Sequence, residues 1–145
     1  MHRAISLTTL MVPGYDEAIA FYVGAVGFTL VEDVDQGEGR RWVVVSPAPD
    51  DPCACGLLLA RAHGERQRAS IGNQTGGRVG LFLRTDDFAR DFAAMRAAGV
   101  VFEEEPRGEP YGTVAVWRDP WGNRWDLIGP ATADAEGAGS EDPAP

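Results

Sequence analysis

Hydrophobic and polar positions in the first half of the chain alternate between the period of strands and that of a helix. Residues 4–12 are rich in β-forming side chains, and Pro13 ends that run. Residues 16–26 carry apolar side chains at helical spacing, and Gly27 ends the helix. Three further extended runs follow, separated by Gly, Pro and Asp turn signals: residues 28–33, 41–46 and 56–61. The first half therefore predicts a βαβββ order.

The second half repeats this order. Residues 79–85 predict a strand, and Asp86 or Asp87 is expected to cap a helix that Gly99 ends. Three strands complete the set, at residues 100–104, 113–117 and 123–128. We therefore expect two βαβββ modules in tandem.

Sequence offsets between the halves support a duplication. The helix-ending Gly27 and Gly99 differ by 99 − 27 = 72 positions, and the Asp-Pro pairs at Asp51 and Asp119 differ by 119 − 51 = 68. Each module is a sheet with one helix-covered face, so two modules can pair their uncovered faces around a cleft. We predict an α+β domain over residues 1–130, with modules at 4–62 and 78–129, a linker at 63–77 and a disordered acidic tail at 131–145.

Composition excludes several classes of partner. The 145 residues include 13 basic and 22 acidic side chains, a net charge of -9, which disfavours nucleic acid and anionic membranes. All the basic residues are Arg, which is typical of a G+C-rich bacterial genome. No apolar run reaches the roughly 20 residues of a membrane span, so we expect a cytoplasmic protein. Cys53 and Cys55 stand without nearby ligating residues and are expected to be ordinary thiols.

One segment, residues 118–127 with the sequence RDPWGNRWDL, predicts a tight turn between two strands. Asp119, Pro120 and Gly122 suit positions of a type I turn. Beyond the turn, Trp125 and its i+2 neighbour lie on one strand face, while Asp126 lies on the other. Asp126 is therefore either a solvated carboxylate or a group aimed into a cavity.

Two motifs carry a resemblance to a known family. The pattern A-x-x-FY-x-x-x-V-GF at residues 18–28 and DPWGNRWDL at residues 119–127 resemble the vicinal oxygen chelate superfamily of glyoxalases, extradiol dioxygenases and bleomycin resistance proteins. The resemblance implies a fold in which two curved four-stranded sheets form a cup. In the metal enzymes of that family, the first and last strands of each module supply the ligands of a divalent ion.

At the positions implied by the resemblance, this chain lacks such a ligand set. They fall on Leu7, Leu58, Gly80 and Asp126, with Arg78 as a second register for the third. Asp126 alone can bind a metal, and a catalytic ion needs about three protein ligands. His2 and His63 are expected at the surface. We therefore expect no cofactor, with a divalent metal as the alternative.

The resemblance and the strand periodicity together predict a pocket. If Asp126 faces the cup, Arg124 does so about 7 Å away along the strand, at roughly 3.3 Å per residue, and pairs with it. An apolar wall with few polar anchors is typical of a small-molecule site. The expected ligand-binding residues besides these two are Leu7, Thr9, Met11, Trp42, Leu58, Gln74, Arg78, Phe82, Arg84, Tyr111 and Trp117.

Three functions remain open. The first is a metal-independent protein that resembles bleomycin-type resistance proteins and sequesters a drug or natural product, with an aromatic or cationic ligand. The second is an enzyme, either a lyase, isomerase or dioxygenase with a non-standard metal site, or a catalyst with Asp126 as general base. Burial would raise the pKa of Asp126 and favour that role, whereas pairing with Arg124 would lower it. The third is a partner-binding or regulatory module whose cup is filled by side chains. The resemblance also implies a homodimer.

Overall fold

The computed structural model describes residues 2–131 of the chain. These residues form two mixed sheets with few helices, which confirms the predicted α+β class. The chain divides into two compact units between Gln74 and Thr75, within the segment predicted to be a linker. The predicted acidic tail lies outside the described residues, apart from residue 131.

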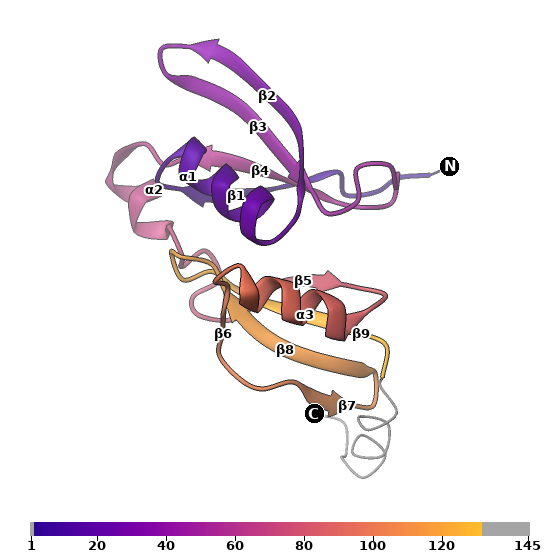
Figure 1. The fold of residues 1–145 in the computed structure, drawn as a ribbon. Coiled ribbons are helices and arrows are strands. Elements are labelled where there is room, and N and C mark those ends of the chain that lie inside the picture. Colours follow the sequence, from indigo (N-terminus) through magenta and orange to yellow (C-terminus); the bar gives the residue numbers. More distant parts are fainter. Residues whose placement is uncertain (1, 132–145) are drawn as a thin grey trace. The chain divides into compact units, whose positions relative to one another are not determined.

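The first unit is a four-stranded sheet with helical turns on one face (Figure 1). Its elements are β1 (Leu7–Val12), α1 (Tyr15–Ile19), η1 (Ala20–Ala25), β2 (Thr29–Gly37), β3 (Arg40–Ser46) and β4 (Gly56–Arg61). The strand order is β1-β4-β3-β2, in which β1 and β4 are parallel and the other pairs antiparallel. The single helix predicted over residues 16–26 is divided into α1 and a π-helical η1.

Alternate residues of these strands bury one face of the sheet. Val43, Val45 and Leu59 are fully buried, as are Ala18 of α1 and Tyr22 of η1. Side chains alternate between the two faces of a strand, so the residues between these core positions lie on the opposite face. That second face, which α1 and η1 do not cover, is the open face of the first sheet.

The predicted linker contains a helix that the sequence pattern did not indicate. This helix is α2 (Gly64–Ser70), and none of its residues is buried. Without a buried apolar face a helix has no hydrophobic period, which explains the missed prediction. Local bonds hold its ends: the His63 amide donates to Gln67 Oε1 at 2.9 Å, and Ser70 Oγ donates to the Gln67 carbonyl at 2.7 Å.

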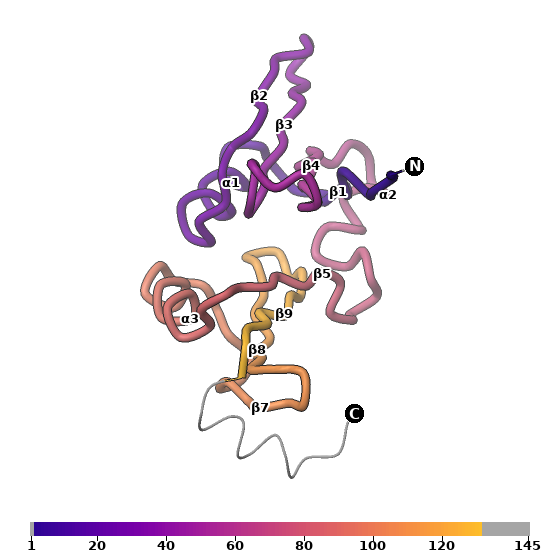
Figure 2. The backbone as a smooth tube through the Cα atoms, turned by 90° about the vertical axis from the view of Figure 1, so that its right-hand side faces the viewer, coloured from indigo at the N-terminus to yellow at the C-terminus, as the bar shows by residue number. Residues whose placement is uncertain are grey.

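The second unit repeats this topology. Its elements are β5 (Val79–Arg84), α3 (Phe88–Ala97), β6 (Val101–Phe102), β7 (Arg107–Glu109), β8 (Gly112–Arg118) and β9 (Arg124–Gly129). The order β5-β9-β8-β6 matches that of the first sheet, and β7 also pairs with β8. The strand predicted at residues 100–104 ends at Phe102, so β6 and β7 share one edge of β8. Figure 2 shows α3 alongside this sheet.

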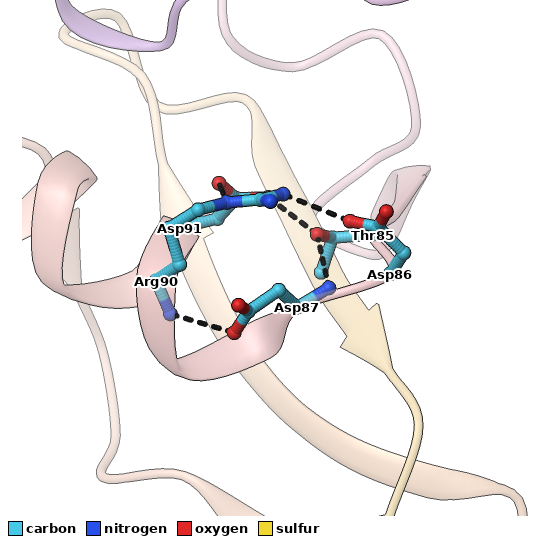
Figure 3. A network of polar contacts seen from close by, with 5 residues as sticks. All are labelled: Thr85, Asp86, Asp87, Arg90 and Asp91. Carbon is cyan, nitrogen blue, oxygen red and sulfur yellow. Dashed lines mark hydrogen bonds and ion pairs between the residues drawn. The ribbon is translucent and has the colours of Figure 1, made fainter.

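A polar network fixes the start of α3 (Figure 3). As predicted, an aspartate caps the helix: Asp87 Oδ1 accepts a hydrogen bond from the Arg90 amide at 3.1 Å. The Thr85 hydroxyl accepts from the Asp87 amide at 3.0 Å and donates to the Asp91 carboxylate. Arg90 forms ion pairs with Asp86 and Asp91, both at 2.9 Å. The Arg90 guanidinium, and then the Thr85 hydroxyl, hold the pKa of Asp91 below its ordinary value.

The face of the second sheet beneath α3 contains the two strand tryptophans. A Cβ atom on Gly129 would lie 2.8 Å from Phe88 of α3, so the alternate β9 positions Trp125 and Leu127 face this helix. Trp117 pairs with Trp125 in register and stacks on it at 4.8 Å between ring centroids. Trp117 is fully buried. The prediction that Trp117 faces the cup is therefore wrong, and Trp125 is also in the core.

The two Asp-Pro turns share two hydrogen bonds. In the second unit, the Trp121 amide donates to Asp119 Oδ1 at 3.0 Å, and the Gly122 amide donates to the Asp119 carbonyl at 3.2 Å. In the first unit, the amides two and three residues after Asp51 donate to its Oδ1 and its carbonyl, at 2.8 and 3.1 Å. The offset of 68 found in the sequence therefore relates two equivalent turns.

Candidate ligand-binding faces

Asp126 lies in the middle of β9 on the face that α3 does not cover, which we call the open face of the second sheet. Its register partners are Val116 on β8 and Phe82 on β5. Partners in register point to the same side of a sheet, so these three side chains share the open face. Phe82 is 64% exposed, an unusual position for a phenyl ring. The face thus combines an exposed aromatic ring with a carboxylate.

The carboxylate of Asp126 is partly enclosed. Its Oδ1 atom is buried and has no hydrogen-bond partner within residues 2–131. Burial raises the pKa of Asp126 above its ordinary value of 3.8, while the nearby guanidinium of Arg107 opposes the rise and the carboxylate of Glu104 adds to it. Asp126 is therefore a carboxyl group whose charge the surrounding protein does not fully compensate.

The predicted pairing of Asp126 with Arg124 is wrong. Arg124 instead forms two hydrogen bonds with the carboxylate of Glu103, at 3.0 and 2.9 Å. It also donates to the Gly77 carbonyl at 2.9 Å. Arg124 is thus held between two other segments of the second unit, and it acts on Asp126 only through its charge.

Sequence reasoning missed the charged residues that follow β6 and form β7. Glu104 accepts a hydrogen bond from the Val116 amide at 2.9 Å, so its carboxylate replaces a strand partner where the edge of the sheet is interrupted. Arg107 forms ion pairs with Glu104 and, at 2.9 Å, with the buried Glu109. The dense run of charges in residues 103–109 was the available signal.

The open face of the first sheet is more apolar. Leu7, Thr9 and Met11 of β1 are in register with Gly56, Leu58 and Ala60 of β4, and Val44 is in register with Leu58. Trp42 lies two residues from Val44 and is half-buried. The predicted residues Leu7, Thr9, Met11, Trp42 and Leu58 therefore share one face.

The other predicted residues lie at edges and turns. The Gln74 amide is bonded to the backbone of β1, accepting from the Met11 amide at 2.6 Å and donating to the Thr9 carbonyl at 3.0 Å. Gln74 therefore has a structural role at the edge of β1. Arg78, Arg84 and Tyr111 are exposed.

The positions that hold metal in the resembling enzymes do not supply a ligand set here. Leu7 and Leu58 are apolar, and Gly80 has no side chain. A Cβ atom on Gly80 would lie 2.5 Å from Thr75 Cγ2, so Thr75 occupies the space of a ligand at that position. Within residues 2–131 no group of three or more His, Cys, Asp or Glu side chains is placed to hold a metal ion. Asp126 alone does not fit a divalent ion.

The family is established by comparison with known proteins. Residues 4–127 match the Glyoxalase/Bleomycin resistance protein/Dioxygenase superfamily, and the chain belongs to it. An uncharacterised protein of Shewanella frigidimarina is 50% identical over 129 residues, which cover 88% of this chain and 94% of that protein. The uncharacterised protein YurT of Bacillus subtilis is 30% identical, with 86% and 97% covered.

Two solved structures share the fold. UcmS2 is 30% identical, with 88% of this chain and 98% of that chain covered and a TM-score of 0.74. TnmS3, an antibiotic binding protein from Streptomyces sp. CB03234, is 30% identical, with 90% and 98% covered and a TM-score of 0.69.

No helix among the described residues is long and apolar enough to cross a membrane.

Proposed function

We propose that this protein binds a small drug or natural product on the open face of its second sheet and sequesters it without a metal ion. The observation that carries the proposal is the buried, unpaired Oδ1 of Asp126 beside the exposed ring of Phe82. A carboxyl group with an unpaired buried oxygen next to an aromatic ring suits a ligand that has a cationic or hydrogen-bond-donating group on a flat body. The likeness to TnmS3, an antibiotic binding protein, supports this ligand class.

The charges around Asp126 favour a cationic ligand group. Four carboxylates stand in this part of the second unit, at Glu103, Glu104, Glu109 and Asp126, against the two guanidiniums of Arg107 and Arg124. The difference of 4 − 2 leaves two negative charges uncompensated. A ligand cation near Asp126 supplies part of the missing charge, and the net charge of -9 attracts it from a distance.

A ligand screen with one substitution tests the proposal. Aromatic cations and their neutral analogues are titrated into the protein, and binding is followed by calorimetry. We expect Asp126→Asn to weaken the binding of the best cation about tenfold or more and to leave its neutral analogue unaffected. Asp86→Asn is the matched control, because Asp86 is an exposed carboxylate beside α3.

Two results would contradict this function. A broad panel that gives no binding excludes a sequestering role, and unchanged affinity in Asp126→Asn removes Asp126 from the site. Elemental analysis of protein purified without chelator addresses the metal separately. Stoichiometric zinc, nickel, iron or manganese would show that the metal-independent part of the proposal is wrong.

The raised pKa of Asp126 favours a second candidate, an enzyme that uses this carboxylate as a general base. A base with a raised pKa accepts a proton from carbon or oxygen more readily than an ordinary aspartate. Turnover of glyoxalase-type substrates by the native chain, lost in Asp126→Asn, would support this candidate over sequestration. Binding without turnover would exclude it for those substrates.

A further inference from the structure

The first sheet separates between β3 and β4, at the end of β3 where the β2–β3 hairpin begins. The register of these strands covers only Val44 with Leu58 and Val45 with Leu57. The same register, if continued, would place Arg41 opposite Arg61, and like charges in opposed positions destabilise strand pairing. Figures 1 and 2 show the β2–β3 hairpin turning away from β4 at this point.

Tyr15 enters the opening between the strands. Its hydroxyl oxygen accepts a hydrogen bond from the Arg41 amide at 3.1 Å, in place of a strand partner. The guanidiniums of Arg41 and Arg61 lie 5.2 and 5.5 Å from the centre of its ring, within the range of cation–π contacts. The hydroxyl proton of Tyr15 is left to donate to another group.

A pocket of about 670 Å³ lies at this opening. Its volume falls within the range of roughly 300–1,000 Å³ that holds small molecules. Trp42, Leu58 and Ala60 supply apolar surface. The polar lining residues include Tyr15, Glu38, Arg40, Arg41, Arg61 and Gln67.

The polar groups of this pocket are mainly donors. Arg41 is neutralised by Asp16 and Asp33, at 2.8 and 2.7 Å. Arg40 and Arg61, by contrast, form no ion pair with any residue from 2 to 131. The Gln67 oxygen accepts from the His63 amide, which leaves the Gln67 amino group to donate.

We infer that this pocket binds a compound that joins an anionic group, a carboxylate, sulfonate or phosphate, to a flat apolar body. Arg40, Arg61 and the Tyr15 hydroxyl contact the anion, and Trp42 and Leu58 contact the apolar body. Guanidinium groups suit such oxyanions because they donate two parallel hydrogen bonds. This inference goes beyond the proposed function, since it concerns the first unit and a ligand group of the opposite charge.

A set of naphthalene compounds tests the inference. The probes 1-naphthoate, naphthalene-1-sulfonate and 1-naphthyl phosphate share one ring and differ in the anion, and neutral 1-naphthalenemethanol is the control. Calorimetry measures affinity, and amide chemical shifts locate the probe. We expect at least one anion to bind, with shifts near Tyr15, Arg41 and Arg61, and the neutral alcohol to bind at least about tenfold more weakly.

Variants then separate charge from folding. The double variant Arg40→Gln with Arg61→Gln is expected to bind the best anion about tenfold or more weakly, while Arg61→Lys keeps part of the affinity. Arg68→Gln is the matched control, because Arg68 is an exposed arginine of α2 that does not line the pocket. Circular dichroism checks that each variant folds.

Four results would overturn the inference. They are absence of binding by all three anions, equal binding of the neutral alcohol, unchanged affinity in the folded double variant, and chemical-shift changes confined to residues 75–131. The preferred anion among those that bind identifies the head group of the natural ligand class.

Discussion

Leu58 and Asp126 occupy the same position in the two halves of the chain. Each lies seven residues after the aspartate of an Asp-Pro turn, on the last strand of its unit. Leu58 contributes apolar surface to its sheet, whereas Asp126 brings a carboxyl group whose Oδ1 is buried. One substitution in a repeated framework thus gives the two open faces different chemistry.

The raised pKa of Asp126 predicts how its substitution changes stability with pH. The folded chain holds the Asp126 proton more tightly than the unfolded chain, so this group lowers the stability of the fold as pH rises from about 3.8 through the raised pKa. Asp126→Asn removes that loss. The free energy of unfolding of the variant relative to the native chain should therefore increase between about pH 3.5 and about pH 7.5. Urea unfolding at both values measures it, and an equal difference at the two values would contradict the prediction.

The Asp119 turn between β8 and β9 depends on one buried carboxylate. Its Oδ1 accepts from the amides of Trp121 and Asn123, at 3.0 and 2.9 Å, and its Oδ2 accepts from Asn123 Nδ2 at 2.7 Å. Asp119→Ala should cost about 3 kcal/mol, because it leaves several donors without a partner. Asp51→Ala is the matched control and should cost about 1 kcal/mol, since its exposed side chain bonds one amide.

Chemical denaturation of both variants measures these costs. A loss of similar size in Asp119→Ala and Asp51→Ala would show that the turn sequence matters and that burial of the carboxylate does not. Both turns are predicted from the Asp-Pro sequence, but their unequal burial is visible only in the structure.

Elements with a buried face were predictable from the sequence. The strand at Gly56–Arg61 has the predicted bounds, and the α3 cap at Asp87 follows from the sequence, because hydrophobic period and capping chemistry are local properties. The helix α2 was missed because nothing in it is buried. The face of Trp117 was missed because a strand buried on both sides shows no alternation.

The surroundings of Asp126 were only partly predictable. Its place on the face shared with Phe82 follows from the strand period, which is why the sequence indicated it. Its electrostatic neighbours do not follow, because Glu104 lies in an irregular segment after β6 and Arg107 begins the short strand β7. Residues 103–109 contain four glutamates and one arginine, and this sequence does not reveal which carboxylates the arginine will bind.

At the scale of the whole molecule, the edge of the first sheet predicts self-association. β2 is an edge strand, exposed along all nine residues, with Val31 and Val34 at 45% and 51% exposure. Such an edge offers unpaired backbone groups to a second chain. We expect a homodimer in sedimentation experiments, and we expect Val34→Lys to shift it toward monomer.

Val101→Lys is the control for this prediction. Val101 is 50% exposed on β6, an edge strand of only two residues in the second sheet. A dimer that dissociates equally in both variants would show that β2 is not the specific contact, and a monomeric native chain would contradict the prediction altogether.

The packing of Thr75 against Gly80 limits the evolutionary routes open to this chain. Thr75 is β-branched, and its hydroxyl donates to the Arg78 carbonyl at 2.6 Å, so its methyl group is fixed over Gly80. A histidine gained at position 80 would clash with that methyl group and lower stability before it could contribute to catalysis. A side chain that could bind a metal at position 80 would thus require a smaller residue at position 75 first, so single mutations at position 80 do not reach such a site.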